Sequence, residues 1–115
     1  MVSAHRFEEL AAEAVDALPP WVLQALDNVQ VVVEDAPPPD QPGLLGLYHG
    51  VPLLYRGWHY SGAMPDRITL YQRSIESVAG ANEERLRRVV ARTVAHEVAH
   101  HLGITDERLL EIDAY

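Results

Sequence analysis

The residues best suited to chemistry lie in the last quarter of the sequence. His96, Glu97 and His100 form the pattern H-E-x-x-H. On an α-helix, two residues four positions apart lie about 40° apart around the axis and about 6 Å apart along it. Both imidazoles can therefore bind one Zn²⁺ ion. Glu97 lies about 100° from His96 around the helix axis. Its carboxylate would therefore lie beside the metal without binding it, and could act on metal-bound water. The spacing predicts a zinc site with an adjacent general base.

A catalytic zinc site also needs a third protein ligand and an open position. Fifteen residues follow His100, so we expect this ligand to lie close by in the sequence. Gly103 can adopt a positive φ as a helix C-cap and reverse the chain, which would bring Asp106 back toward the metal. The other acidic candidates, which no comparable turn places, are Glu107, Glu111 and Asp113.

A helix over residues 83–102 must position these side chains. Asn82 is an expected N-cap, acidic residues follow it, and Gly103 ends the segment. His96 and His100 lie where an apolar face meets a polar edge, which is the expected boundary of a cleft. The expected core residues are Leu86, Val90, Ala91, Val94, Ala95, Val98 and Leu102, and the polar edge carries Arg85, Arg88 and Arg92.

Two residues of this helix need a separate interpretation. Arg87 falls within the apolar face, so its side chain is expected to extend along the surface to reach solvent. His101 points toward the core, about 140° from His96. We expect it to be a buried, hydrogen-bonded orienting residue and not a metal ligand. The alternative for the whole segment is a buried helix whose histidines are satisfied by hydrogen bonds.

The rest of the chain supplies the elements that support this helix. A helix of about four turns is expected to begin after Ser3 and to end before Pro19. Residues 29–34 have the β-branched composition of a strand, and residues 67–72 alternate as a half-buried strand does. The shorter expected elements are a helix over 21–26, a proline-rich loop over 35–43, a hairpin or bulged pair of strands 44–49 and 51–55, a loop over 57–66, a helical turn over 74–78 and a short helix over 106–113.

Composition limits the class of protein. With 115 residues, of which 48% are hydrophobic, we expect one α+β domain over residues 1–115, with a small mixed sheet packed against the long helix. The net charge of −8 argues against a nucleic-acid partner. Cysteine is absent, so a metal must bind His, Asp or Glu. No leader or membrane span is recognisable, and we expect a cytoplasmic protein that does not bind membranes.

The motif resembles that of a known family. Extended to Gly103 and Asp106, it reads H-E-x-x-H-x-x-G-x-x-D, which is similar to the metzincin pattern with Asp as third ligand, as in the snapalysins. The segments VVVED at 31–35, LLGLY at 44–48 and ITLY at 68–71 also look like the minimal zincin-like metallopeptidases of bacteria. The resemblance implies a compact zincin domain in which His96, His100 and Asp106 bind zinc and Glu97 is the general base.

The activity that this resemblance implies is hydrolysis of a peptide bond in a peptide or protein substrate. Glu97 would take a proton from metal-activated water and deliver it to the leaving amine. We expect residues 67–72 to form the edge strand that holds the substrate. Tyr48, Tyr71 and Tyr115 are candidates to polarise the carbonyl, with aromatic packing as the alternative for each.

Two other functions fit the same motif. One is a non-catalytic zinc-binding module that binds a partner, and the other is a zinc hydrolase that acts on a non-peptide bond. Glu97 argues against the first, because a structural zinc site has no use for that carboxylate. The remaining histidines, His5, His49 and His59, are expected to be solvated or structural, and the arginines of the 83–102 helix are expected to form a solvated face.

Overall fold

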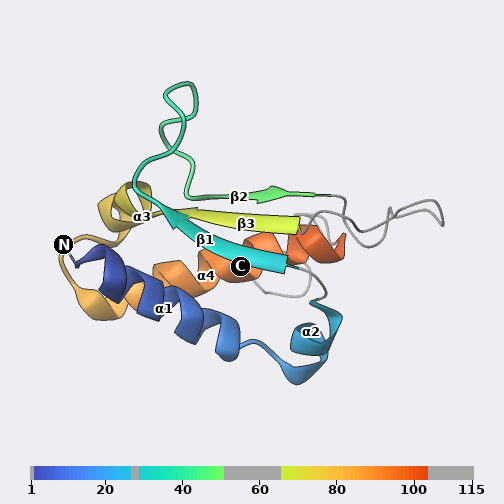
Figure 1. The fold of residues 1–115 in the computed structure, drawn as a ribbon. Coiled ribbons are helices and arrows are strands. Elements are labelled where there is room, and N and C mark those ends of the chain that lie inside the picture. The colour runs from blue at the N-terminus through green and yellow to red at the C-terminus, as the bar shows by residue number, and fades with distance from the viewer. Residues whose placement is uncertain (1, 27–28, 51–65, 104–115) are drawn as a thin grey trace.

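The computed structural model describes residues 2–26, 29–50 and 66–103, and within them the chain forms four helices and three strands (Figure 1). The fold is the expected α+β arrangement. Two of the elements have the predicted bounds to the residue. The expected strand 51–55, the expected helix 106–113 and all but the last residue of the expected loop 57–66 lie outside the described residues, and Asp66 itself begins a strand. The elements in chain order are α1 (Ala4–Asp16), α2 (Pro20–Ala25), β1 (Val29–Glu34), β2 (Gly46–His49), β3 (Asp66–Tyr71), α3 (Gln72–Ala79) and α4 (Glu83–Leu102).

The sheet has the strand order β1-β3-β2, with β1 parallel to β3 and β2 antiparallel to it. The expectation that residues 67–72 form an edge strand is therefore wrong, because β3 is the central strand and pairs on both sides. Its alternating sequence suggested one solvated face, yet both Thr69 and Tyr71 are buried together with Ile68 and Leu70. Among the described strands, β1 and β2 are the outer ones.

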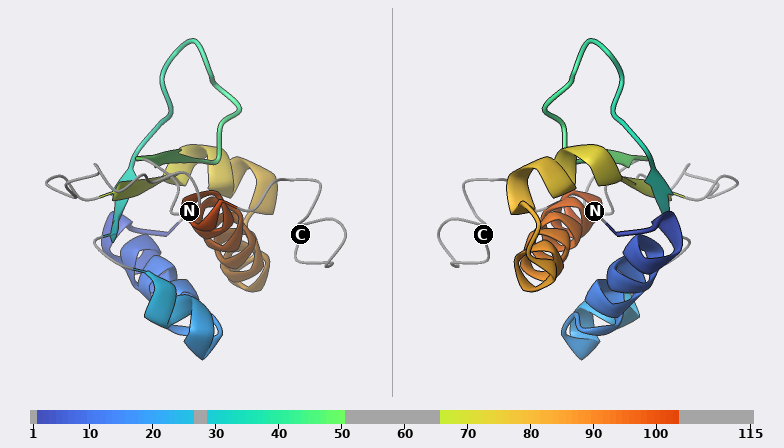
Figure 2. Two further views of the ribbon diagram at one scale, coloured as in Figure 1. Left: turned by 90° about the vertical axis from the view of Figure 1, so that its right-hand side faces the viewer. Right: turned by 90° about the vertical axis from the view of Figure 1, so that its left-hand side faces the viewer.

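The helices α1 and α4 lie side by side under one face of the sheet, as the two end views show (Figure 2). The core forms where the side chains of these helices and the sheet meet. Phe7 of α1, Ile68 of β3 and Val94 of α4 are fully shielded from solvent. The long helix is thus held against both β2 and β3, which places its C-terminal half beside the edge strand β2.

Local capping explains why α4 begins and ends where the sequence predicts. The Asn82 side chain accepts a hydrogen bond from the Arg85 backbone N–H at 3.1 Å, and Gly103 takes the left-handed conformation with φ 83°. Ser3 caps α1 in the same way by accepting from the Arg6 N–H at 3.0 Å. Both caps are as expected, since each depends only on neighbouring residues.

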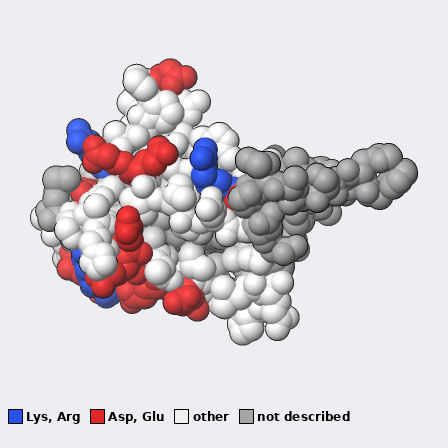
Figure 3. Space-filling model, viewed as in Figure 1, with Lys and Arg blue, Asp and Glu red and all other residues white. Residues whose placement is uncertain are grey.

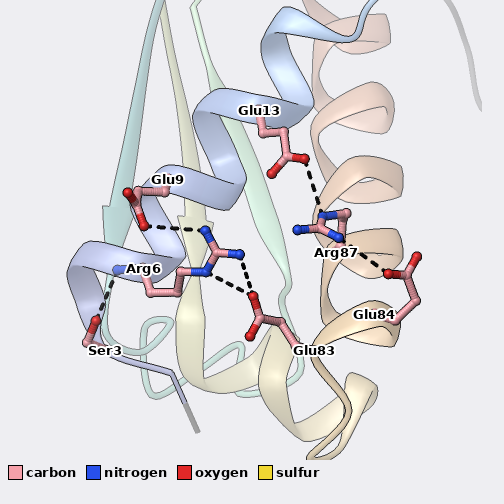
Figure 4. Close-up of polar contacts among 7 residues, drawn as sticks. All are labelled: Ser3, Arg6, Glu9, Glu13, Glu83, Glu84 and Arg87. Atoms are coloured by element: carbon pink, nitrogen blue, oxygen red, sulfur yellow. Dashed lines mark hydrogen bonds and ion pairs between the residues drawn. The ribbon is translucent and has the colours of Figure 1, made fainter.

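Ion pairs join the solvent-facing sides of α1 and α4 (Figure 4). Arg6 Nε donates to Glu83 at 2.9 Å, and Arg87 Nε lies 3.4 Å from the Glu13 carboxylate. The Arg87 side chain is partly exposed, as predicted for an arginine that reaches out of an apolar face. Ala91, expected in the core, is exposed, because α1 and the sheet cover a narrower strip of α4 than the apolar residues suggest.

Two further boundaries differ slightly from the predictions. The helix α2 begins at Pro20, one residue earlier than expected, with proline in the first turn where its missing N–H costs nothing. The helix α3 follows directly on Tyr71 and runs for two turns to Ala79, longer than the single turn expected. None of the helices in the described ranges has both the length and the apolar character that a bilayer span requires.

Candidate metal centre

The C-terminal half of α4 brings His96, Glu97 and His100 together as predicted. One ligand atom from each of the three side chains lies within 4.8 Å of the other two. His100 Nδ1 is 3.2 Å from Glu97 Oε1, and His96 Nε2 is 4.0 Å from Glu97 Oε2. The two imidazole rings lie 4.5 Å apart between centroids and are steeply inclined to each other. The helical spacing alone therefore places two imidazoles and one carboxylate at a common point.

The three side chains differ in how far solvent reaches them. Glu97 is 8% exposed, whereas His96 is 22% and His100 is 35% exposed. The carboxylate thus forms the inner part of the cluster, and the two imidazoles form its outer part. Within the described residues, solvent therefore reaches the two imidazoles more easily than it reaches the Glu97 carboxylate.

A glycine on the neighbouring strand makes this burial of Glu97 sterically feasible. A Cβ atom at Gly46 would lie 2.9 Å from Thr93 Cγ2 and 3.2 Å from Glu97 Cγ. Any larger residue would push β2 away from α4 at the level of the candidate site. Sequence reasoning assigned Gly46 no role, although a glycine inside an apolar strand is a signal of close backbone approach.

The donor set suits zinc. Zinc binds imidazole nitrogen at about 2.0–2.1 Å, so two nitrogens on one tetrahedral ion lie roughly 3.3 Å apart. Donor atoms that already lie within 4.8 Å of one another can converge to that spacing by small side-chain rotations. The predicted third ligand Asp106 and its alternatives at 107, 111 and 113 lie outside the described residues.

A second polar cluster lies on the core side of the same helix turn. His101 Nδ1 is 2.8 Å from Asp66 Oδ2, and the Tyr48 hydroxyl donates to the same oxygen at 2.6 Å. His101 is fully buried and Asp66 is 2% exposed. The prediction that His101 is buried and hydrogen-bonded is confirmed, and Asp66 is the partner that sequence reasoning did not identify.

Gly50 is required by this second cluster. Its φ of 151° is in the region that favours glycine. A Cβ atom there would clash with the Asp66 carboxyl group and approach the Tyr48 hydroxyl to 2.9 Å. The polypeptide after β2 can therefore pass close to the carboxylate only because residue 50 has no side chain.

Three tyrosines were candidates to polarise a substrate carbonyl, and the structure describes two of them, Tyr48 and Tyr71. Tyr48 uses its hydroxyl as a donor to Asp66, and its ring packs edge-on against His101 at 5.7 Å. Tyr71 is buried at the end of β3, where burial, and secondarily the charge of Glu34, raise its pKa. Tyr115 lies outside the described residues.

The other histidines that the structure describes are not part of the metal cluster. His5 is exposed on α1, where its Nε2 lies 3.9 Å from Glu9. His49 is exposed at the end of β2, and His59 lies outside the described residues. Both described histidines agree with the prediction of a solvated position.

Comparison with known proteins identifies the class to which this fold and cluster belong. The family model for zincin-like metallopeptidases matches residues 26–115, and the chain belongs to this family. It is also similar to the solved structure of a conserved hypothetical protein from Thermus thermophilus, with 28% sequence identity and a TM-score of 0.61. That match covers 88% of this chain and 94% of the other. No curated protein matches the sequence.

Proposed function

We propose that this protein is a zinc-dependent metallopeptidase that hydrolyses peptide bonds. The observation that carries the proposal is the convergence of His96, Glu97 and His100 within 4.8 Å in a chain of the zincin-like metallopeptidase family. His96 and His100 would hold the metal, with Asp106 as third ligand. Two imidazoles and a carboxylate make a ligand set common among catalytic zinc sites.

When bound, zinc supplies a Lewis acid that polarises the scissile carbonyl and lowers the pKa of water toward roughly 7. The protein contributes Glu97 as the proton carrier. Its carboxylate is held between the two histidines and is largely shielded from solvent. In this position it can take a proton from the attacking water and pass it to the leaving amine.

The substrate would lie along β2. Among the described strands, β2 is the outer strand on the α4 side, and Gly46 brings its backbone against Glu97. An extended peptide could add to the outer edge of β2 by backbone hydrogen bonds. That position would run the substrate past the outer face of His96 and His100. The proposed occupant is therefore a peptide or protein segment in extended conformation.

Glu97 favours a catalytic over a purely structural zinc site. A structural site uses four protein ligands and needs no general base, whereas here a buried carboxylate lies 3.2 Å from a histidine nitrogen, where it can act on water beside the metal. A cytoplasmic location and the absence of nucleic-acid and membrane partners remain predictions from composition.

The test is a cleavage assay with a peptide library on protein whose zinc content is measured in the same sample. We expect chelator-sensitive cleavage by the wild type. Glu97→Gln should retain stoichiometric zinc and lose at least about 100-fold in rate, since a general base typically contributes 10²–10⁴-fold. Glu84→Gln, an exposed change on the same helix, is the control. Full activity of Glu97→Gln would refute the assignment, and zinc binding without cleavage by the wild type would favour a non-catalytic module or a non-peptide substrate.

A further inference from the structure

The arginines of α4 fall into two groups that differ in their partners. Arg87 pairs with Glu13 and Glu84, as Arg6 and Arg73 elsewhere pair with carboxylates. In contrast, no ion pair joins Arg85, Arg88 or Arg92 to any residue in the described part of the chain, and all three are exposed. In a protein with 17 acidic and 9 basic residues, exposed arginines that form no ion pair with any described residue are unexpected.

These three arginines lie on the strip of α4 that leads to the metal cluster. At about 100° per residue, each of them lies within roughly 80° of His96 around the helix axis. Arg88 precedes Arg92 by four residues, and Arg92 precedes His96 by four. Like charges at this spacing repel and destabilise a helix. Within the described residues these three guanidinium groups form no ion pair, so a bound anion would supply the opposite charge that they lack there.

A hollow connects Arg92 to the candidate site. It has a volume of about 190 Å³ and is lined by Leu45, Arg92, Thr93 and His96. Leu45 immediately precedes β2, so the hollow lies between the start of that strand and α4. A peptide lying along β2 would place a side chain in this hollow directly beside His96. The guanidinium of Arg92 would then be within reach of that side chain or the next one.

Acidic side chains elsewhere on the molecule would make binding of an acidic ligand less favourable at those places than at this strip. On the face shown in Figure 3, acidic side chains predominate over basic ones. Glu8 and Asp16 line the groove between α1 and β1. An acidic peptide would be repelled there and attracted to the arginine strip. A basic peptide would experience the opposite forces.

We propose that Arg92, supported by Arg88 and Arg85, binds carboxylate side chains of the substrate next to the metal centre, so that the protein selects acidic peptide segments. This inference rests on the proposed peptidase function, because it assigns the specificity of that site. Arginine suits the role, since its planar guanidinium can bind a carboxylate through two parallel hydrogen bonds.

Binding can be measured without relying on catalysis. The probes are two labelled peptides that differ only in carrying Glu or Gln at the same positions, and the protein is zinc-loaded Glu97→Gln. We expect the Glu peptide to bind about tenfold more tightly, as is typical of one charge-assisted contact. The additional change Arg92→Gln should abolish that preference, and Arg92→Glu should reverse it, so that the Gln peptide binds more tightly than the Glu peptide. Added salt should weaken the preference.

Arg73→Gln is the matched control, since Arg73 is an exposed arginine on α3 paired with Asp35. Equal binding of the Glu and Gln peptides, or an equal loss in Arg73→Gln and Arg92→Gln, would overturn the inference. Wild-type protein that cleaves both peptides at the same rate would also overturn it, while leaving the peptidase function intact. Charge-selective binding without cleavage of either peptide would support the arginine site and count against the peptidase function alone.

Discussion

His101 and Asp66 form a buried pair, with Nδ1 of the histidine 2.8 Å from Oδ2 of the carboxylate. Their positions in the sequence are 35 residues apart, and the pair joins the start of β3 to the last turn of α4. His101 directly follows His100, so its contact with Asp66 anchors the helix turn that carries one of the proposed zinc ligands. The strength of this pair is therefore relevant to the site as well as to the fold.

Removal of Asp66 should destabilise the protein strongly. Asp66→Ala removes the acceptor that the buried His101 and the half-buried Tyr48 share, at an expected cost of about 3–5 kcal/mol in free energy of unfolding. Asp66→Asn keeps an acceptor oxygen and should cost about 1–3 kcal/mol. Denaturant unfolding of metal-free protein measures both changes. Asp35→Ala is the control, because the exposed Asp35–Arg73 pair should contribute under about 1 kcal/mol. Equal effects of Asp66→Ala and Asp35→Ala would contradict the structural role.

The metal ligands can be tested by zinc content. His96→Ala and His100→Ala each remove one donor from the cluster, and both should lose stoichiometric zinc. His49→Ala, a change at an exposed histidine, should retain it. Circular dichroism establishes that each variant is folded, since the changes are at partly exposed positions. Stoichiometric zinc in folded His96→Ala or His100→Ala would exclude that histidine as a ligand.

Gly46 should tolerate no side chain. In Gly46→Ala the new methyl group would meet Thr93 Cγ2 and Glu97 Cγ, so we expect a loss of about 1–3 kcal/mol in stability and reduced peptide cleavage with zinc retained. Thr93→Ser in the same protein removes the nearest methyl group and should restore part of both losses. Gly43→Ala, where a Cβ meets nothing within 4 Å, is the matched control. A Gly46→Ala protein with wild-type stability and activity would show that close packing of β2 against Thr93 and Glu97 is not required.

Tyr71 should make the fold sensitive to alkaline pH. Burial raises its pKa above the ordinary value of 10.0. Below pH 10 the hydroxyl is neutral in both the folded and the unfolded chain, so its contribution to stability is fully present there. As pH rises through 10, Tyr71 ionises in the unfolded chain before it ionises in the folded one. The contribution of Tyr71 to stability is therefore lost between the unfolded and the folded pKa. Tyr71→Phe should therefore lose less stability than the wild type above pH 10. Identical alkaline unfolding curves for the two proteins would contradict this assignment.

Local features of the sequence were sufficient to predict α4 and its cluster. Asn82 and Gly103 define the ends of the helix through contacts with residues at most four positions away, and the spacing of His96 and His100 follows from helix geometry. The position of β3 in the sheet was not predictable in the same way. Strand order depends on pairing between segments such as β1 and β3, which lie far apart in the sequence, and alternation of side chains does not distinguish an outer from a central strand.

The sequence by itself therefore determined the two candidate histidine ligands, the carboxylate beside them and the helix that carries all three, because their spacing follows one helical repeat. Only the tertiary structure decided what surrounds that helix. Because β2 packs closely against α4, only a glycine at position 46 leaves room for the Glu97 side chain. The start of β3 places Asp66 within hydrogen-bonding distance of His101. The contact between α1 and α4 pairs Arg87 with Glu13. Arg92, in contrast, lines the same hollow as His96. These relationships are long-range, and side-chain types at single positions do not specify which distant residue they will meet.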